Sequence, residues 1–275
     1  MIKTRVLKYI GLGIGAIIIA GIPKKKIDVT DYVIHTKKIN HDIRFCVIAD
    51  LHCRRYGENQ SKIKEIVEKM KPDAIIIPGD LFDVDRDYEI SFELIDALEG
   101  YPIYFTSGNH DIYLKDEIEG LRQRLRDKGV HVLEDERCLF AKGLDTVEIY
   151  GMKDQGRSVK MKGKDLKYLF YSDDYRILIS HRPEYEEFYK NVDCDLIISG
   201  HAHGGQFRIP FINKGIYAPQ QGFFPKYCDG VHKMKNSNLV ISRGLASGDP
   251  RIPRLFNDPE IVFITLKPKE KKQSQ

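Results

Sequence analysis

The sequence lacks several features that mark common classes of protein. Its five cysteines are an odd number, are scattered and include no Cys-x-x-Cys pair, which argues against both a disulfide framework and a zinc knuckle. The 44 basic and 40 acidic residues are interspersed and leave a formal net charge of only +4, so no basic surface favours nucleic acid as a partner. No internal repeat is present. With 275 residues, 42% of them hydrophobic, the chain can bury one large core, which predicts a single large domain.

Long hydrophobic runs are also absent, apart from one stretch near the N-terminus. Residues 9–22 contain no charge and are flanked on both sides by basic residues: Lys3, Arg5, Lys8, Lys24, Lys25 and Lys26. A run of this length suits either a signal-peptide apolar region or a short membrane span. Because Ile18-x-Ala20 is a poor cleavage site, we expect residues 1–26 to be a retained single-pass or signal anchor in a bacterial cell membrane. The flanking charges are nearly balanced, so they leave open the side of the membrane on which the domain lies.

The domain expected at residues 27–266 alternates between strands and helices. Apolar runs rich in β-branched residues predict strands, and apolar residues at a spacing of three and four predict helices. The expected strands are 29–39 at a sheet edge, 43–49, 74–77, 103–106, 130–133, 147–150, 177–179, 196–199, 239–242 and 261–266. The expected helices are 60–70, 90–98, 116–128 and 184–190, with a surface excursion at 152–174 and a charged tail at 267–275. This rhythm predicts an α/β fold.

Polar side chains follow five of these apolar runs at their C-terminal ends. In α/β sheets the connecting loops converge at that edge, and ligands bind there. The residues are Asp50, His52, Asp80, Asn109, His110, His181, His201 and His203. Carboxylates, a carboxamide and imidazoles without a thiolate suit divalent ions such as Mn²⁺, Fe²⁺ or Zn²⁺. Each residue alone could instead be a helix cap, a turn residue or a buried structural histidine, but their joint occurrence at strand ends predicts a metal site.

The stretch Gly200–Gln206 holds two of these histidines close together. They are one residue apart, and the neighbouring glycines permit the sharp turns that let both rings reach one place. Taken alone, the stretch is either a metal loop or a surface loop with two solvated histidines. The residues at the other strand ends favour the metal loop.

These motifs occur in the order found in calcineurin-like metallophosphoesterases, which the sequence resembles from about residue 43 to residue 266. The matching motifs are Asp50-x-His52, Gly79-Asp80, Gly108-Asn109-His110-Asp111, His181 and Gly200-His201-x-His203. A membrane-anchored branch, with YkuE- and YaeI-type phosphodiesterases and some UDP-diacylglucosamine pyrophosphohydrolases, is similar in further features. These are the N-terminal apolar stretch, Ser180-His181-Arg182-Pro183, the aromatic and proline-rich stretch after Gln206, Arg254 and Pro259-Glu260-Ile261. The resemblance implies an α/β sandwich of two mixed β-sheets flanked by helices.

The same resemblance implies a dinuclear metal centre, with Mn²⁺ as the expected metal and Fe²⁺, Zn²⁺ or Mg²⁺ as alternatives. Asp80 would bridge the two ions together with a hydroxide that attacks phosphorus. One site would be completed by Asp50, His52 and His203, and the other by Asn109, His181 and His201.

Residues beside these ligands are candidates for catalysis and substrate binding. By the resemblance, His110 would stabilise the transition state or protonate the leaving group, with Asp111 orienting its ring. A structural turn residue is the other interpretation of His110. Three nearby arginines could bind phosphate oxygens or could be structural: Arg54, Arg55 and Arg182. The aromatic stretch from Phe211 to Pro225 could line a pocket for an acyl chain or a nucleobase, or could pack on the core.

Together, these features predict a metal-dependent phosphohydrolase of the phosphodiesterase or pyrophosphatase type at the membrane. The anchor favours a lipid-linked or envelope phosphate substrate, such as a UDP-diacylglucosamine-like compound, although the same metals suit monoesters as well. The alternatives are a catalytically silent binding scaffold and a broad phosphomonoesterase. Scaffolds related to this family typically lack ligands or the catalytic histidine, and here both are complete.

Overall fold

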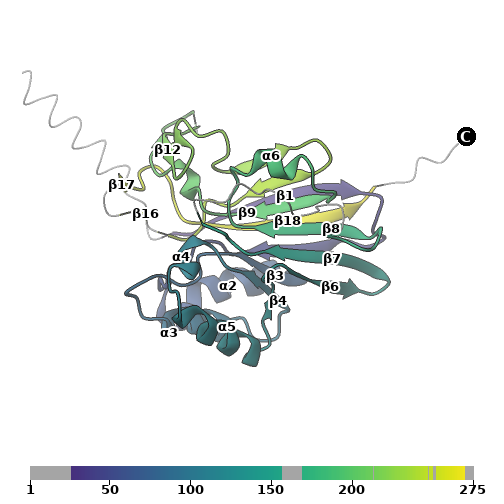
Figure 1. Ribbon diagram of the computed structural model, residues 1–275, viewed down its shortest axis with the longest axis horizontal. Helices are drawn as coiled ribbons and strands as arrows, with labels where there is room; N and C mark the ends of the chain where they lie inside the picture. Colours follow the sequence, from purple (N-terminus) through teal and green to yellow (C-terminus); the bar gives the residue numbers. More distant parts are fainter. Residues whose placement is uncertain (1–25, 157–168, 213, 247, 250–251, 270–275) are drawn as a thin grey trace, which may run out of the picture.

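The computed structural model describes residues 26–156, 169–212, 214–246, 248–249 and 252–269 (Figure 1). Almost all of the expected anchor, most of the expected surface excursion and the end of the charged tail lie outside the described residues. Within the described part of the chain, no helix is long and apolar enough to cross a membrane.

The first sheet contains six strands in the order β1–β18–β2–β3–β4–β5. They are β1 Asp28–Thr36, β2 Ile43–Val47, β3 Ala74–Pro78, β4 Ile103–Thr106, β5 His131–Val132 and β18 Glu260–Pro268. Strands β2 to β5 are parallel, whereas the C-terminal strand β18 lies antiparallel to β2 and parallel to β1. The sheet is therefore mixed, and β1 forms its edge, as the alternating residues at 29–39 predicted.

The second sheet also contains six strands, in the order β14–β15–β9–β8–β7–β6. They are β6 Glu136–Lys142, β7 Asp145–Met152, β8 Tyr175–Ser180, β9 Leu196–Ser199, β14 Gly230–Lys233 and β15 Asn238–Ile241. The four central strands are parallel, and the edge strands β6 and β14 are antiparallel to their neighbours. Strand β6 was not predicted, because its charged, largely exposed residues give only a weak apolar signal.

Helices cover the outer faces of the two sheets unequally (Figure 1). The helices are η1 Glu58–Gln60, α2 Ser61–Met70, α3 Glu89–Ala97, α4 Asn109–Ile112, α5 Glu117–Asp127, α6 Glu186–Tyr189 and η3 His203–Gly205. Helices α2, α3 and α5 pack on the first sheet through residues such as Ile63, Phe92 and Leu121. The second sheet is covered by α6 and by Leu169 and Phe170, which are buried. The expectation of a surface excursion is therefore wrong for these last two residues.

The core between the sheets is built from alternate strand residues. Phe45 and Ile76 of the first sheet belong to the same buried cluster as Ile177 and Ile198 of the second. The intervening residues face outwards, as Cys46 does toward the helices. Both faces of the central strands are buried, which explains why these strands appear in the sequence as nearly continuous apolar runs.

Two small hairpins follow β9 and its loop. They are formed by β10 Arg208–Ile209 with β11 Lys214–Gly215, and by β12 Tyr217–Ala218 with β13 Gly222–Phe223. We call residues 207–212 and 214–229 the hairpin lobe. A third pair follows β15 and consists of β16 Gly248–Asp249 and β17 Ile252–Pro253. None of these was predicted, because strands of two residues carry no periodic signal.

The strand ends that carry the polar motifs converge at one edge of the sandwich. In the first sheet, the Asp50 N–H donates to the Gly79 carbonyl at 3.2 Å, which joins the loops after β2 and β3. In the second, the Gly200 N–H donates to the His181 carbonyl at 3.2 Å. The Leu245 N–H donates to the Ala49 carbonyl at 2.9 Å and so links the two sheets. The expected α/β fold with two mixed sheets is confirmed.

Candidate metal centre

Five of the polar residues at this edge have a left-handed backbone conformation. They are Asp50, His52, Asp80, His201 and His203, with φ between 46° and 68°. This region costs a residue with a side chain about 1 kcal/mol or more, and such strain concentrates at functional sites. The turns aim the five side chains into one volume, between the loops of the two sheets.

Two glycines bring the backbone against the carboxylates of this volume. A Cβ on Gly108 would lie 2.3 Å from Asp80 Oδ1, and a Cβ on Gly244 would lie 2.3 Å from Asp50 Oδ2. Gly244 also has a φ of +68°, which disfavours any side chain there. Gly244 was not among the predicted site residues, because it lies after β15 in a stretch without a motif.

The first cluster of candidate ligands consists of Asp50, His52 and His203. One ligand atom from each lies within 4.8 Å of the other two, and all three residues are buried. His52 Nε2 and His203 Nδ1 have no hydrogen-bond partner among the described residues. The Asp50 carboxylate accepts the backbone N–H of His201 at 3.0 and 3.1 Å, which fixes its position beside the second sheet.

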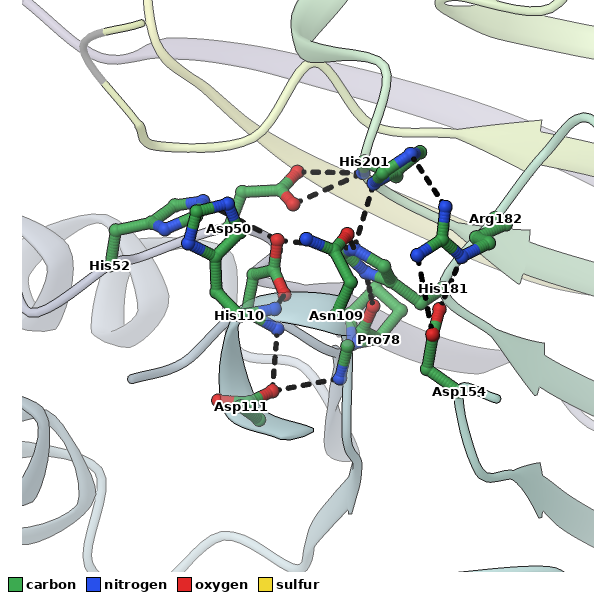
Figure 2. Close-up of polar contacts among 12 residues, drawn as sticks. Asp50, His52, Pro78, Asn109, His110, Asp111, Asp154, His181, Arg182 and His201 are labelled. Atoms are coloured by element: carbon green, nitrogen blue, oxygen red, sulfur yellow. Dashed lines mark hydrogen bonds and ion pairs between the residues drawn. The ribbon is translucent and has the colours of Figure 1, made fainter. Parts of the chain in front are cut away.

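The second cluster consists of Asp80, His181 and His201, with Asn109 beside it. His181 Nδ1 lies 2.8 Å from the Pro78 carbonyl and must donate to it, so Nε2 is the ring nitrogen left to bind an ion. This nitrogen is 3.1 Å from Asp80 Oδ2, 3.1 Å from His201 Nδ1 and 3.2 Å from Asn109 Oδ1. Figure 2 shows Asn109 and the two rings directed at one another. Four acceptor atoms therefore meet at one point.

Asp80 is common to both sides of the site. Its Oδ2 lies 3.5 Å from His52 Nε2 as well as 3.1 Å from His181 Nε2, yet it accepts no hydrogen bond from any described residue. Lone pairs that converge in a buried space repel one another unless a proton or a cation lies between them. Imidazole, carboxylate and carboxamide donors suit divalent transition ions. The residues present therefore fit two divalent ions that share Asp80.

Burial and mutual charge set the protonation of these groups. Burial raises the pKa of Asp50 to about 6 and lowers the pKa values of His201 and His203 well below the usual range. Burial opposes the charge on His181, but Asp80 outweighs it and raises the pKa of His181 to about 10. Burial acts against the ionised form of Asp80 too, but His181 and His52 hold its pKa well below its usual value. His201 and His203 are therefore neutral near pH 7, as metal binding requires, and a bound cation would replace the proton that Asp80 favours on the His181 ring.

His110 stands at the rim of the site with its ring partly exposed. Its Nδ1 lies 2.7 Å from Asp83 Oδ1, and its ring meets that of His52 edge-to-face at 4.5 Å. Burial lowers the pKa of His110, but the contact with Asp83 outweighs burial, and the net shift is upward. The second oxygen of Asp83 is 3.3 Å from His52 Nδ1, so one carboxylate contacts both rings.

The contact expected between Asp111 and the His110 ring is wrong. The Asp111 carboxylate is buried and accepts three backbone N–H groups at 2.8 Å, from Asp80, Phe82 and Gly108. It therefore fixes the loop after β3 to the turn before α4, as Figure 2 shows in part. The carboxylate that contacts the ring is Asp83. In the sequence, the position of Asp83 three residues after Asp80 was the sign that it belongs to the site. An acidic residue in a turn is too common for that position alone to reveal its role.

The three candidate arginines differ in what they contact. Arg55 lies on the surface and pairs with Glu93. Arg182 is buried, with its Nε donating to Asp154 at 2.6 Å and its Nη1 3.3 Å from His201 Nε2 (Figure 2). Arg54 is partly buried, and its Nε has no hydrogen-bond partner among the described residues. Of the three, Arg54 has a buried Nε without a partner among the described residues, while Arg182 lies against a candidate ligand.

Gln220 of the hairpin lobe is a further residue that the sequence analysis missed. Its Oε1 lies 2.6 Å from His201 Nε2, closer than the Arg182 guanidinium at 3.3 Å. We assign the His201 Nε2 proton to the shorter contact, which leaves the Nδ1 lone pair directed at the second cluster. No motif marks Gln220, because it lies in a stretch whose glycines, prolines and aromatic residues predicted neither strands nor helices.

Comparison with known proteins agrees with this geometry. The Calcineurin-like phosphoesterase family profile matches residues 43–205, well over half of the chain. The chain is 26% identical over 244 residues to the metallophosphoesterase YkoQ of Bacillus subtilis, a match that covers 86% of this chain and 87% of that protein. It is 26% identical over 228 residues to the phosphodiesterase YaeI of Escherichia coli, covering 80% of each. A purple acid phosphatase from yellow lupin seeds superposes with a TM-score of 0.49 at 13% identity, over 84% of this chain and 50% of that one.

The matched residues begin with strand β2 and end at Gly205, so they contain all five loops that form the two clusters. Members of this family use a dinuclear centre of divalent ions to hydrolyse phosphoesters. The polar residues at the ends of its strands meet as that chemistry requires. With the family profile matched over residues 43–205, the chain belongs to the calcineurin-like metallophosphoesterases and is a phosphoester hydrolase.

Proposed function

We propose that the chain hydrolyses a phosphodiester or pyrophosphate bond in a lipid-linked or envelope phosphate compound at a bacterial cell membrane. Among candidate substrates of this class, we propose a UDP-diacylglucosamine-like molecule first. The observation that carries the catalytic part is the convergence of buried lone pairs around Asp80. The uncharged run at residues 9–22 and the similarity to YaeI, which is named a phosphodiesterase, support the substrate class.

The two clusters indicate how the metal ligands would be divided. Asp80 would contribute to both sites, because its carboxylate belongs to the second cluster and also lies beside His52. The remaining ligands would be Asp50, His52 and His203 for one ion and Asn109, His181 and His201 for the other. Mn²⁺ suits such mixed oxygen and imidazole donors, with Fe²⁺, Zn²⁺ and Mg²⁺ as competitors. When bound, two such ions lower the pKa of a water molecule and offset the charge of phosphate oxygens.

His110 would serve as the general acid for the leaving group. Asp83 occupies its Nδ1 and favours the protonated ring, so Nε2 holds a proton that can pass to a leaving oxygen. The ring is 37% exposed, so a substrate can reach it from solvent. Its neighbour Asp111 would act only through the backbone, by holding the loop that carries Asp80.

The residues behind the ligands fix which ring nitrogens face the ions. The Pro78 carbonyl accepts from His181 Nδ1, and Gln220 accepts from His201 Nε2, so each ring presents its other nitrogen. Such partners commonly raise metal affinity by holding one tautomer and one ring orientation. Arg54, whose Nε has no partner among the described residues, is the arginine we propose for contact with substrate phosphate.

The test is an assay of the purified full chain after metal removal and reloading with Mn²⁺, Fe²⁺, Zn²⁺ or Mg²⁺. Substrates should include UDP-diacylglucosamine, phospholipids, wall polymers and chromogenic phosphomonoesters and diesters. We expect turnover of a diester or pyrophosphate, highest with Mn²⁺ and absent in Asp80→Ala. Preference for monoesters would favour the broad phosphomonoesterase. No turnover of any substrate by protein with a full metal content would favour the binding scaffold.

A further inference from the structure

The hairpin lobe carries large apolar side chains that are exposed. Phe211 is fully exposed, and Ile212, Phe223 and Phe224 are 60%, 74% and 69% exposed. Two of the four lie between β10 and β11, and the others lie in and after β13. These aromatic side chains do not pack on the core, so that interpretation of the stretch is wrong for them. Exposed apolar groups gathered in one region mark a contact surface rather than ordinary surface variation.

The base of the lobe, by contrast, is firmly attached to the metal loop. The Ile216 N–H donates to the carbonyls of Gly205 and Phe207 at 3.1 and 2.8 Å. The Phe224 N–H donates to the Ile216 carbonyl at 2.7 Å, which joins the second hairpin to this base. Ala202 of the metal loop is buried against Ala218 of the lobe. The lobe is therefore fixed at its base beside the site. Its small side chains are buried there, and its aromatic side chains are exposed to solvent.

The N-terminal end of the domain lies at the same edge of the sandwich. Asp28, the first residue of β1, pairs through Oδ2 with Arg243 Nη2 at 3.0 Å. Arg243 immediately precedes Gly244, which lies against Asp50 of the metal site. The uncharged run ends at Ile22, and the chain from there to Asp28 can span at most about 20 Å. If the uncharged run lies in a bilayer, this edge must lie close to its surface.

We propose that the hairpin lobe is a membrane-contact surface, on which Phe211, Ile212, Phe223 and Phe224 enter the interfacial layer of a lipid bilayer. Exposed aromatic and aliphatic side chains suit that layer, because it lies between the apolar acyl chains and the hydrated head groups. Lys214, exposed on β11, would lie among anionic head groups. The lobe then holds the metal-site edge toward the lipid. This inference rests on the membrane location in the proposed function and does not depend on catalysis.

The sequence contains no tryptophan, so one introduced tryptophan reports on its own surroundings. The variants are Phe211→Trp and Phe223→Trp in the full chain, placed in phosphatidylethanolamine and phosphatidylglycerol vesicles with brominated acyl chains. The matched control is Leu144→Trp, a 92% exposed apolar residue in the turn between β6 and β7, at the opposite end of the parallel strands. We expect a blue shift and loss of emission at positions 211 and 223 and an unchanged spectrum at 144.

Emission at positions 211 and 223 that matches position 144, in protein that sediments with the vesicles, would overturn the proposal. A blue shift that appears only after a cell extract is added would also overturn it, in favour of a protein partner. Circular dichroism checks that each variant is folded, independently of activity. Quenching in folded variants, without hydrolysis of a water-soluble chromogenic diester by these variants or by the unchanged protein, would leave the surface intact and reject only the catalytic part of the proposed function.

Discussion

Asp80 has a different environment at each of its carboxylate oxygens. Oδ1 accepts the backbone N–H of His110 at 2.8 Å, which fixes the side chain. Oδ2 lies between the two clusters, near His52 and His181, and accepts no hydrogen bond from the part of the chain that the structure describes. A carboxylate that is held on one side and open on the other can serve two ions without moving.

Replacing Asp80 by Ala should therefore remove both metal ions together, with activity falling to background. The two sites would lose their shared anion, and the repulsion between two close cations would no longer be offset. Elemental analysis of the purified protein measures the metal content, with Asp173→Asn, an exposed surface change, as the control. Two tightly bound ions in the Asp80 variant would contradict the shared role.

His110 and Asp83 should act as a unit. His110→Ala should keep the metal content and lower kcat by on the order of 10² to 10⁴, the usual contribution of a general acid. Asp83→Asn should lower kcat by less, and should have no further effect in the His110→Ala background, because its role passes through that ring. If the second change still lowers kcat there and metal is lost, Asp83 acts through His52 instead.

At the scale of the elements, the hairpin lobe contributes directly to the candidate centre. Gln220→Ala should weaken the binding of Mn²⁺ by about 10- to 100-fold, because the His201 ring loses the acceptor that fixes its tautomer. Gln220→Glu keeps an acceptor and should retain the affinity. Calorimetric titration of metal-free protein measures both, and equal affinity in all three proteins would reject this role.

Asp145, at the start of β7, makes a pH-dependent contact between the second sheet and the segment that precedes β2 of the first. The Asp145 carboxylate accepts four hydrogen bonds of 2.7–2.8 Å from the backbone and side chains of Asn40 and His41. Burial raises the pKa of Asp145, but these donors outweigh it and lower the net value. A lowered pKa adds stability that is present above the unfolded carboxyl pKa of about 3.9 and is lost as the pH falls.

Asp145→Asn should accordingly lower the free energy of unfolding by about 2 kcal/mol near pH 7. The difference from the unchanged protein should shrink as the pH falls below about 4 toward the lowered folded-state pKa, because protonation removes the same charge. Urea unfolding at a series of pH values measures it, with Asp173→Asn as the exposed control. A difference that stays constant with pH would show that the effect is not due to charge.

The helices and strands also show how much of this fold and site could be predicted from the sequence. Helix α2 and strands β3 and β4 were predicted within one residue, because each has a clear apolar pattern and a break at its end. The motif loops were identified because their residue types suit only a few kinds of chemistry. Gln220 and Gly244 could not be found in this way, since a glutamine in a turn and a glycine after a strand are ordinary until the fold brings them to the site.

At the scale of the whole molecule, the metal centre joins loops from both sheets. Removing the metals should therefore lower the stability of the entire domain. The ions would bind only the folded state, and without them the carboxylates and imidazoles of the two clusters would lie close together with no cation between them. At free metal about 100 times the Kd, the loss is about 2.7 kcal/mol per site, or about 5–10 °C in Tm. Calorimetry of apo and Mn²⁺-loaded protein checks this, and equal Tm values would contradict it.

The topology of the first sheet determines when this centre can form. Strand β1 is synthesised before every other described strand, yet its partner in the sheet is β18, which is synthesised after all of them. The Glu260 side chain at the start of β18 accepts the Arg243 N–H at 2.9 Å, and the Glu260 N–H donates to the Gly244 carbonyl at 3.1 Å, beside Asp50. Pairing over such a separation comes late in folding. Until β18 is added to the sheet, the chain therefore lacks the contacts that hold Arg243 and Gly244 beside Asp50, so we expect the metal site to become fully ordered only after β18 has paired.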